Sequence, residues 1–475
     1  MKWLFLTNNA LFLSEFFGKL ANEAMEQGDD CLVVWNSKVA EYGKKKFFPK
    51  EAKFISKIDW CIENYKPEQK EFGNLSWKEL FSVFDRSKST KNFSYDNSLK
   101  MVSHLYQFFK FVFQKEKPDV VIGESPTDLF HEVAFYFCKI NNIPYVGLGG
   151  SRFNDRIELF DLKFTYSKNE ESFKEIKDED ISEKEKEFAK NFIEQFISHK
   201  YIPSYVGLGK FRLSQFGIIK HYLEKIKTDS SWSWQYLKKR KYFKDIDYES
   251  EARMRRSFSA PLRMEKRQFR ILFQKKIFSK INNNDIFFLY PLQYQPEAST
   301  SVGATYYSDQ LSTISNIAFS LPLPYKLYVK EHLASIGLRK NNFYKKLQQI
   351  PNIVLIPYSE NVEKLVRKSS GVITLNSTIG MEAVLSGKVA YALGKSSYSY
   401  HPLCRKVKNF EELKKKIEDD LVDKPRIDDL ENINYRFIVS WFRNTIKGSI
   451  VSASQGKDIN DYRLIYENLK KVLLR

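Results

Sequence analysis

The sequence has few cysteines, glycines and prolines, and it lacks long apolar runs. Its 475 residues include four cysteines, which lie far apart and form no CxxC pair: Cys31, Cys61, Cys138 and Cys404. This scarcity excludes a disulfide framework, argues against a zinc site and is typical of a reducing compartment. The apolar run at residues 2–6 is too short for a signal peptide, and no later run reaches the length of a membrane span. We therefore expect a cytoplasmic protein, at most peripheral on the inner membrane.

Two signatures of phosphate and metal binding are also missing. The pattern GxxxxGK[ST] of phosphate-binding loops does not occur. No Asp-x-Asp follows a predicted strand, because residues 178–180 lie in a charged helical stretch and residues 245–247 in a basic one. We therefore expect neither a metal nor a bound cofactor.

Positive charge is what the sequence has in excess. It holds 77 Lys and Arg against 58 Asp and Glu, a formal net charge of +19. Residues 231–280 alone hold fifteen Lys and Arg against five Asp and Glu, a net of +10. Such an excess suits an anionic partner, and no nucleic-acid motif accompanies it. We expect no nucleic acid and favour contact of 231–280 with an anionic membrane surface or an acidic ligand; a solvated helix face is the alternative.

The first part of the chain has the pattern of an α/β domain. The apolar runs predict strands at 2–7, 31–35, 119–123 and 143–147, with helices at 13–27, 101–116 and 128–141. Residues 36–98 are expected to form loops and short helices. The charged stretch 170–200 predicts a solvated helix at the edge of this domain.

The second α/β region shows a regular alternation of strands and helices. Strands are predicted at 286–291, 325–330, 353–356, 371–375 and 389–393, with helices at 308–320, 342–349, 361–369 and 380–386. This alternation predicts a doubly wound parallel sheet, whose ligands bind beyond the carboxyl ends of the strands. Two such domains facing a cleft make the GT-B arrangement of many glycosyltransferases.

The predicted fold class is therefore α/β and GT-B-like, with two Rossmann-like doubly wound domains facing a cleft and a helical basic insertion. The expected division is a first domain at 1–230, the insertion at 231–280, a second domain at 281–410 and helices at 411–475.

Three polar clusters follow strands of the second region. Residues 293–300 (QYQPEAST) offer the carboxylate of Glu297 beside amide and hydroxyl groups, although, taken alone, a turn with a helix cap explains them better. Lys330 and His332 arrive together at the end of a strand and would suit a phosphate; a surface lysine with a half-buried histidine is the alternative.

The third cluster runs from a strand into a helix start. Ser377, Thr378 and Gly380 there predict an anion site made of hydroxyls and backbone N–H groups. Glu382, expected in the first helical turn, would bond a ribose hydroxyl or favour the helix dipole. A Ser or Thr helix cap is the structural alternative.

Taken together, the segments YPLQYQPEAST, LYVKEH and TLNSTIGMEAVLSGKVAYALG resemble the capsule polysaccharide biosynthesis family. That family includes bacterial 3-deoxy-manno-octulosonic acid (Kdo) transferases of GT-B fold, which use CMP-Kdo without a metal. The resemblance covers about residues 286–410 and reaches the N-terminal part only loosely. The family's Gln-Pro-Glu motif corresponds to Gln295-Pro296-Glu297, and its Lys-Glu-His-Pro motif to Lys330-Glu331-His332, with Leu333 in place of the usual proline.

The N-terminal part offers the residues expected to bind the acceptor. Glu124 ends a predicted strand and would serve as a base for an acceptor hydroxyl or as a nucleophile; an acid at a helix N-terminus is the alternative. Asp128 lies one helical turn further on, and Arg152 follows the next strand, where it would bind an acidic sugar or acceptor.

The resemblance implies a metal-independent glycosyltransferase of bacterial capsule or lipopolysaccharide synthesis. It would transfer a sugar, such as Kdo or a related acidic sugar from a CMP donor, to a glycan or glycolipid acceptor. Glu124, Glu297 and His332 would be catalytic, and the donor would be held by Gln295, Lys330, His332, Ser377, Thr378, Gly380 and Glu382. A GT-B-like sugar-nucleotide epimerase and a non-catalytic partner of polysaccharide assembly or export are the alternatives.

Overall fold

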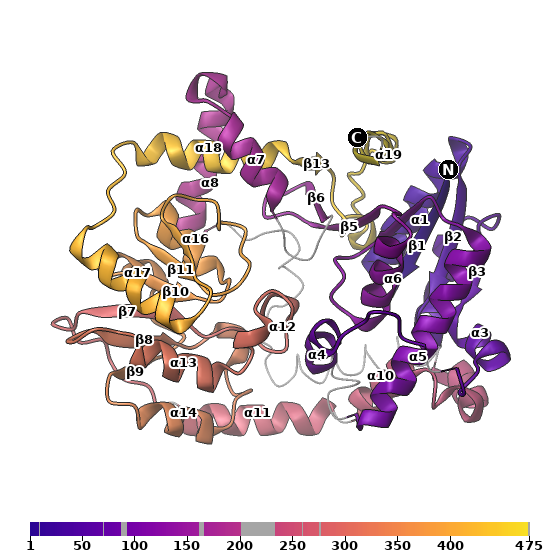
Figure 1. The fold of residues 1–475 in the computed structure, drawn as a ribbon, viewed down its shortest axis with the longest axis horizontal. Helices are drawn as coiled ribbons and strands as arrows, with labels where there is room; N and C mark the ends of the chain where they lie inside the picture. Colours follow the sequence, from indigo (N-terminus) through magenta and orange to yellow (C-terminus); the bar gives the residue numbers. More distant parts are fainter. Residues whose placement is uncertain are drawn as a thin grey trace. The chain divides into compact units, whose positions relative to one another are not determined.

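The computed structural model describes residues 1–8, 10–69, 71–86, 93–160, 166–200, 233–258, 260–274 and 277–473. The chain forms two compact units, each with its own sheet (Figure 1). The first unit comprises Met1–Lys163, Pro203–Pro261 and Thr445–Arg475, and the second comprises Phe164–Ile202 and Leu262–Asn444.

The first unit is built on a seven-stranded sheet. Its strands are β1 (Lys2–Thr7), β2 (Asp30–Trp35), β3 (Lys53–Ser56), β4 (Val120–Gly123), β5 (Tyr145–Gly150), β6 (Arg156–Phe160) and β13 (Thr445–Lys447). The order is β13-β6-β5-β4-β1-β2-β3, in which β1 to β5 are parallel to one another, β6 is antiparallel to β5, and β13 is antiparallel to β6. The central strands are almost wholly buried, because helices cover both faces of such a sheet and leave no room for alternating polar residues.

The helices of the first unit surround this sheet. They are α1 (Leu11–Glu26), α2 (Lys38–Lys44), α3 (Lys57–Asn64), α4 (Trp77–Arg86), α5 (Tyr95–Phe111), α6 (Leu129–Ile140), α10 (Tyr248–Phe258) and α19 (Tyr462–Leu473), with the short turns η1 (Lys45–Phe47), η2 (Val112–Glu116) and η7 (Ala453–Gln455). Residues 233–243 are helical as well.

The second unit contains a six-stranded, wholly parallel sheet. Its strands are β7 (Phe287–Pro291), β8 (Lys326–Lys330), β9 (Ile353–Ile356), β10 (Val372–Thr374), β11 (Ala390–Ala392) and β12 (Cys404–Lys406). Their order, β12-β11-β10-β7-β8-β9, is the doubly wound order of a Rossmann sheet. The predicted α/β class with two Rossmann-like sheets is confirmed, whereas the cleft between the domains stays a prediction.

The helices of the second unit include two from the middle of the chain. They are α7 (Ser167–Glu175), α8 (Glu183–Ile197), α11 (Ala260–Gln274), α12 (Ala298–Ser301), α13 (Gln310–Phe319), α14 (Asn341–Gln348), α15 (Val362–Lys368), α16 (Thr378–Leu385), α17 (Phe410–Val422) and α18 (Leu430–Arg443), with the turns η3 (Asp178–Asp180), η5 (Thr305–Tyr307) and η6 (Leu333–Ser335).

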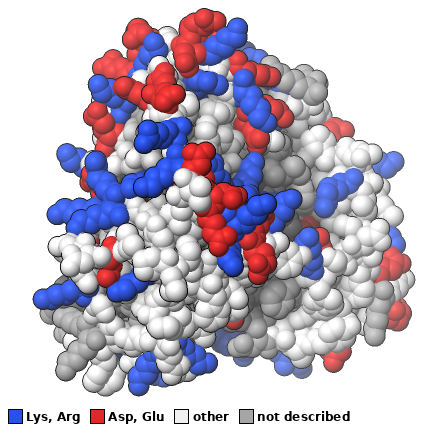
Figure 2. Space-filling view, turned by 60° about the vertical axis from the view of Figure 1, so that its left-hand side comes forward, with Lys and Arg blue, Asp and Glu red and all other residues white. Residues whose placement is uncertain are grey.

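The charged stretch 170–200 is helical as predicted, but it packs on the second unit and not on the first. Both α7 and α8 contact α18, where Arg443 bonds Glu185 at 2.8 Å. Figure 2 shows charges of both signs intermingled over this end of the molecule, at the top of the view. Such mixed charge explains why the stretch looks like a solvated helix in the sequence, since its apolar side is narrow.

The basic stretch 231–280 divides between the two units. Tyr236 and Phe243 are buried with Val39 and Ile58 in a small core of the first unit. By contrast, α11 belongs to the second unit. Two of the aromatic residues interleaved with the basic ones, Tyr236 and Phe243, are therefore core residues of the first unit.

Strands β3, β6, β12 and β13 were not predicted. β3 has four residues, none of them fully buried, so its sequence lacks the apolar run of a central strand. β6 and β13 pair with each other across most of the chain. Local patterns do not reveal such a pairing, which depends on the tertiary fold.

A buried carboxylate joins the two ends of the chain within the first unit. Asp29 accepts hydrogen bonds from Trp3 Nε1 at 2.9 Å and from the hydroxyl of Tyr466 at 2.7 Å, and it pairs with Lys470 at 3.0 Å. Burial by itself would raise the pKa of Asp29, but the bonds from the amino group of Met1, from Tyr466, Lys470 and Trp3 outweigh it and lower the pKa to about 2. Asp29 therefore holds α19 against β1.

We expect Asp29→Asn to lower the free energy of unfolding by roughly 2 kcal/mol at neutral pH. Because the folded pKa is depressed, the contribution is present above the ordinary value of 3.8 and is lost as the pH falls towards about 2. Thermal unfolding of both proteins from neutral to acid pH measures it. The adjacent, exposed Asp30 supplies the control: an equal loss in Asp30→Asn would contradict the assignment.

Candidate functional site

The chain order of the second sheet reverses between β7 and β10. In a doubly wound sheet the ligand crevice lies at this point, beyond the carboxyl ends of the strands. The three predicted clusters follow β7, β8 and β10, which are neighbours in the sheet. The structure therefore brings the three clusters to one edge.

Two side-chain bonds connect the loop after β7 with the loop after β10. The buried side chain of Gln293 donates from Nε2 to Thr374 Oγ1 at 3.3 Å, and Asn376 Nδ2 donates to the carbonyl of Ser299. Gly303 is required here, because a Cβ at this position would lie 2.4 Å from the oxygen of Ser299 and 2.8 Å from Asn376 Nδ2. The first and third clusters are therefore fixed to each other.

The loop after β8 is tied to the same place by a buried ion pair. Glu331, 2% exposed, accepts from Arg339 Nη1 at 2.5 Å, from the backbone N–H of His332 at 2.6 Å and from the hydroxyl of Tyr344. Arg339 also donates to the carbonyl oxygen of Gln293. Arg339 and Tyr344 were not among the predicted site residues. The sequence feature that points to them is the acidic Glu331 at the end of a buried strand, because a buried carboxylate needs a partner.

His332 is a neutral hydrogen-bond donor at physiological pH. Its Nδ1 accepts from the backbone N–H of Ala334 at 3.1 Å, which leaves the ring proton on Nε2. The packed atoms around the ring disfavour the charged form, and Arg339 and Lys330 repel it, so that the pKa of His332 is lowered to about 4. The residue nevertheless remains exposed and accessible to a ligand. The predicted phosphate contact of His332 would therefore be a hydrogen bond and not an ion pair.

Lys330 supplies the cation of this edge. It is 6% exposed and donates from Nζ to the carbonyl of Tyr358 at 2.9 Å. Burial lowers the pKa of Lys330, while Glu331, Glu360 and Glu382 act in the opposite direction. A buried lysine with donor capacity to spare suits a phosphate oxygen.

The third cluster forms a capped helix start, as predicted. Ser377 accepts from the N–H of Ile379 at 3.3 Å, and Thr378 is the first residue of α16. Gly380 has a packing role, because a Cβ there would lie 2.2 Å from the hydroxyl of Tyr398. The turn presents hydroxyls and backbone N–H groups, which suit an anion, and their contact with a donor stays a prediction.

Glu382 differs from its predicted position. It lies beyond the first turn of α16, is buried, and pairs with His199 Nε2 at 3.2 Å. The hydrogen bond that His199 donates to the carboxylate of Glu382 raises the pKa of His199. His199 follows α8, a helix that the sequence assigned to the first domain, so this pair was not foreseeable. A ribose contact of Glu382 stays a prediction, and it would have to compete with His199.

In the Gln-Pro-Glu motif, Gln295 is half-buried and Glu297 is exposed. Gln295 donates to the carbonyl of Ser308 at 2.6 Å and accepts from Gln310 Nε2 at 2.7 Å. Both ends of its amide thus shape the loop. Glu297 is exposed and accepts from the hydroxyl of Ser299 at 2.9 Å, so its carboxylate faces solvent.

The first sheet has a corresponding switch point between β1 and β4. Asn8, directly after β1, donates from Nδ2 to Glu124 at the end of β4, and the hydroxyl of Tyr145 bonds the carbonyl of Glu124 at 2.5 Å. Beside them lies a cavity of about 220 Å³, lined by Asn8, Ala10, Asn36, Ser37, Asp128 and Glu249. Glu124 and Asp128 are therefore at one strand edge, as their positions in the sequence predicted.

The two other residues predicted for this unit, Asp128 and Arg152, lie differently with respect to the cavity. Asp128 caps α6, accepting from the backbone N–H of His131 at 2.9 Å, and its other oxygen bonds the ring of His131 at 2.8 Å. Arg152 lies between β5 and β6 and does not line the cavity. Asn8 and Asn36 line the cavity but were not among the predicted site residues, although each directly follows a predicted strand.

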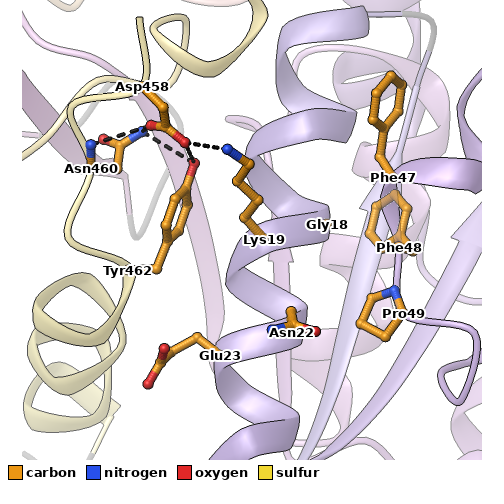
Figure 3. Close-up of a pocket in the computed structure, with 10 residues that line it drawn as sticks. All are labelled: Gly18, Lys19, Asn22, Glu23, Phe47, Phe48, Pro49, Asp458, Asn460 and Tyr462. Atoms are coloured by element: carbon orange, nitrogen blue, oxygen red, sulfur yellow. Dashed lines mark hydrogen bonds and ion pairs between the residues drawn. The ribbon is translucent and has the colours of Figure 1, made fainter.

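A larger groove of about 560 Å³ lies on the helical side of the first unit, away from these strand ends. Figure 3 shows Lys19 on α1 pointing at Asp458, with a distance of 2.5 Å between them. Asn460 and Tyr462 also bond Asp458, at 2.7 and 3.1 Å. Because these polar groups satisfy one another and no predicted residue lies there, the groove is not the candidate site.

Within the described ranges no three His, Cys, Asp or Glu side chains are grouped so as to hold a metal ion. The expectation of a metal-free, cofactor-free protein stays a prediction. Nor does any helix in those ranges have the length and apolarity required to span a bilayer.

Residues 262–428 match the family model described as capsule polysaccharide biosynthesis protein. This match confirms the resemblance predicted from the three clusters, over a region that is less than half of the chain. No curated protein matches the sequence.

Similar solved structures include two from Thermosulfurimonas dismutans. The first is KpsC, beta Kdo 2,7 transferase, with a TM-score of 0.33 and 10% sequence identity; the match covers 77% of this chain and 89% of that chain. The second is KpsC, beta Kdo 2,4 transferase, with a TM-score of 0.37 and 12% identity; the match covers 76% of this chain and 93% of that chain. UDP-GlcNAc 2-epimerase from Neisseria meningitidis is also similar, with a TM-score of 0.25 and 12% sequence identity; the match covers 93% of this chain and 100% of that chain. TM-scores this low do not establish a shared fold, so the fold rests on the strand orders above.

We expect the pair of Glu382 and His199 to make stability depend on pH. Since the pKa of His199 is raised above 6.5, the pair stabilises the folded protein below that value, and the contribution is lost as the pH rises through the raised pKa. Glu382→Gln and His199→Gln should therefore lower the melting temperature more at about pH 6 than at about pH 9. Equal losses at both pH values would show that the pair carries no charge.

Proposed function

We propose that the chain is a nucleotide-sugar-dependent glycosyltransferase of bacterial surface polysaccharide synthesis. The observation that carries this proposal is the family match over residues 262–428, which contain the three polar clusters that meet at the switch point of the second sheet. Ligands of doubly wound sheets bind at this point.

The second unit would bind the donor. Lys330 would contribute positive charge to a phosphate, while His332 Nε2 and the N–H groups at the start of α16 would donate hydrogen bonds. Such preorganised donors stabilise a departing nucleotide without a metal, because they are already oriented where negative charge develops. The donor is proposed to be a CMP-sugar, with Kdo or a related acidic sugar as the group transferred.

The first unit would bind the acceptor. Carboxylates of Glu124, Asp128 and Glu249 and amides of Asn8 and Asn36 meet at its switch point. Carboxylate and amide groups suit the many hydroxyls of a glycan. Glu124 and the exposed Glu297 are the carboxylates proposed to act as base, acid or nucleophile.

Nucleotide binding and donor turnover test this proposal separately. Calorimetric titration with CMP, UDP, GDP and TDP should show a preference for CMP; a preference for another nucleotide would remove the CMP-Kdo assignment alone. Incubation with the donor sugar nucleotide should yield a transferred product only when a glycan acceptor is present. Conversion of the donor without an acceptor would favour an epimerase, and binding without any turnover would favour a non-catalytic partner.

We expect Lys330→Ala to weaken CMP binding by about 10- to 100-fold, the value of a charge-assisted hydrogen bond to phosphate. Lys326, at the opposite end of the same strand, pairs with Asp285 at 2.9 Å and supplies the matched control. Lys326→Ala should leave the affinity unchanged in the same calorimetric titration. If both variants bound CMP as the unaltered protein does, the phosphate would lie elsewhere.

A further inference from the structure

Helix α11 fits closely on the loop that follows the Lys330-Glu331-His332 cluster. Arg267 donates from Nε to the carbonyl of Ile336 at 2.7 Å, and Gln274 donates to the carbonyl of Arg339 at 2.8 Å. Gly337, with a φ of +71°, allows this contact, since a Cβ there would lie 2.6 Å from the carbonyl oxygen of Arg267. One face of α11 is therefore fixed against the candidate donor site.

The opposite face of α11 carries an apolar stripe that is open to solvent. Leu262, Phe269 and Phe273 are 54%, 63% and 57% exposed, and their spacing of seven and four residues places them on one side of the helix. The rings of Phe269 and Phe273 lie 4.7 Å apart. Leu272, 66% exposed, adds to the same side.

Exposed apolar side chains are common on protein surfaces when they occur singly. Phe319 and Leu323, at 71% and 95% exposure, are such cases, because one ends α13 and the other lies in the following turn. The residues of α11 differ, since four of them lie toward one side of a single helix of 15 residues, about 22 Å long.

Positive charge flanks the stripe. Lys266 lies within one turn of both Leu262 and Phe269, and Arg263 and Arg270 lie along one side of the stripe. One acidic residue, Glu265, also lies within a turn of Leu262 and Phe269, so the border is basic on balance. The wider segment 231–280 holds a net charge of +10. Apolar side chains bordered by basic ones are characteristic of helices that lie in the plane of an anionic bilayer surface.

We propose that α11 is an interfacial helix that binds an anionic lipid surface through Leu262, Phe269, Leu272 and Phe273. Its other face holds the loop at 333–341, so binding would bring the donor site to about one helix diameter, roughly 10 Å, from the lipid headgroups. If the proposed function holds, the acceptor is then a lipid-linked glycan. This refines the predicted contact of 231–280 to one face of one helix.

The test is sedimentation of the full chain with phosphatidylcholine vesicles that contain about 30% phosphatidylserine, against vesicles of phosphatidylcholine alone. We expect binding to the anionic vesicles that weakens as salt rises. The double variant F269S/F273S should bind at least about tenfold more weakly. The double variant F319S/L323S, altered at two exposed sites off the stripe, should bind like the unaltered protein.

A fluorophore placed on the stripe reports insertion directly, because its emission depends on the polarity of its surroundings. An NBD label on F269C should shift to the blue with anionic vesicles, and the same label on F319C should not. Absence of binding to anionic vesicles at low salt, or equal binding by F269S/F273S, would overturn the proposal. So would a dimer in sedimentation velocity that F269S/F273S dissociates, because the stripe would then bind a second copy. None of these results depends on turnover, so a failed transferase assay would leave the lipid proposal standing.

Discussion

The buried carboxylate of Glu331 is the interaction on which the donor-side edge depends. A charge this deeply buried is tolerated only when it is paired and hydrogen-bonded, and removal of one partner of such a pair costs about 3–5 kcal/mol. Arg339, Tyr344 and the N–H of His332 satisfy it, and Arg339 extends the connection to the loop after β7. The loops after β7 and β8 are thereby held at one strand edge. The bonds from Gln293 to Thr374 and from Asn376 to Ser299 join the loop after β10 to them.

The two sheets present groups of different charge at their strand edges. The packed atoms around the ring of His332 and the nearby positive charges keep this ring neutral. Lys330 and the helix start at Ser377 are therefore the groups that can balance the negative charge of a phosphate. At the first sheet the balance is reversed, because the cavity beside Glu124 is lined by carboxylates and amides. In the proposed transfer from a nucleotide sugar to a glycan, the second unit would supply the groups that suit anions and the first unit those that suit hydroxyls.

Much of this arrangement could be predicted from the sequence, because buried parallel strands are apolar runs that end in polar residues at the ligand edge. The positions of Glu124, Lys330, Ser377 and Thr378 followed from that rule alone. The partners of buried groups did not, since Arg339 is eight residues from Glu331 and His199 reaches Glu382 from a distant helix. Short or edge strands such as β3 and β6 were missed because they lack a long apolar run.

Hydrogen–deuterium exchange with and without a saturating nucleotide tests the central claim most directly. With saturating CMP, or with UDP if UDP binds more tightly, we expect slower hydrogen exchange of the backbone amides at 330–336 and 374–380. Those segments contain the end of β8 and the start of α16. Protection confined to the groove at Lys19 and Asp458, or no protection at saturation, would contradict the assignment of the donor site to the second sheet.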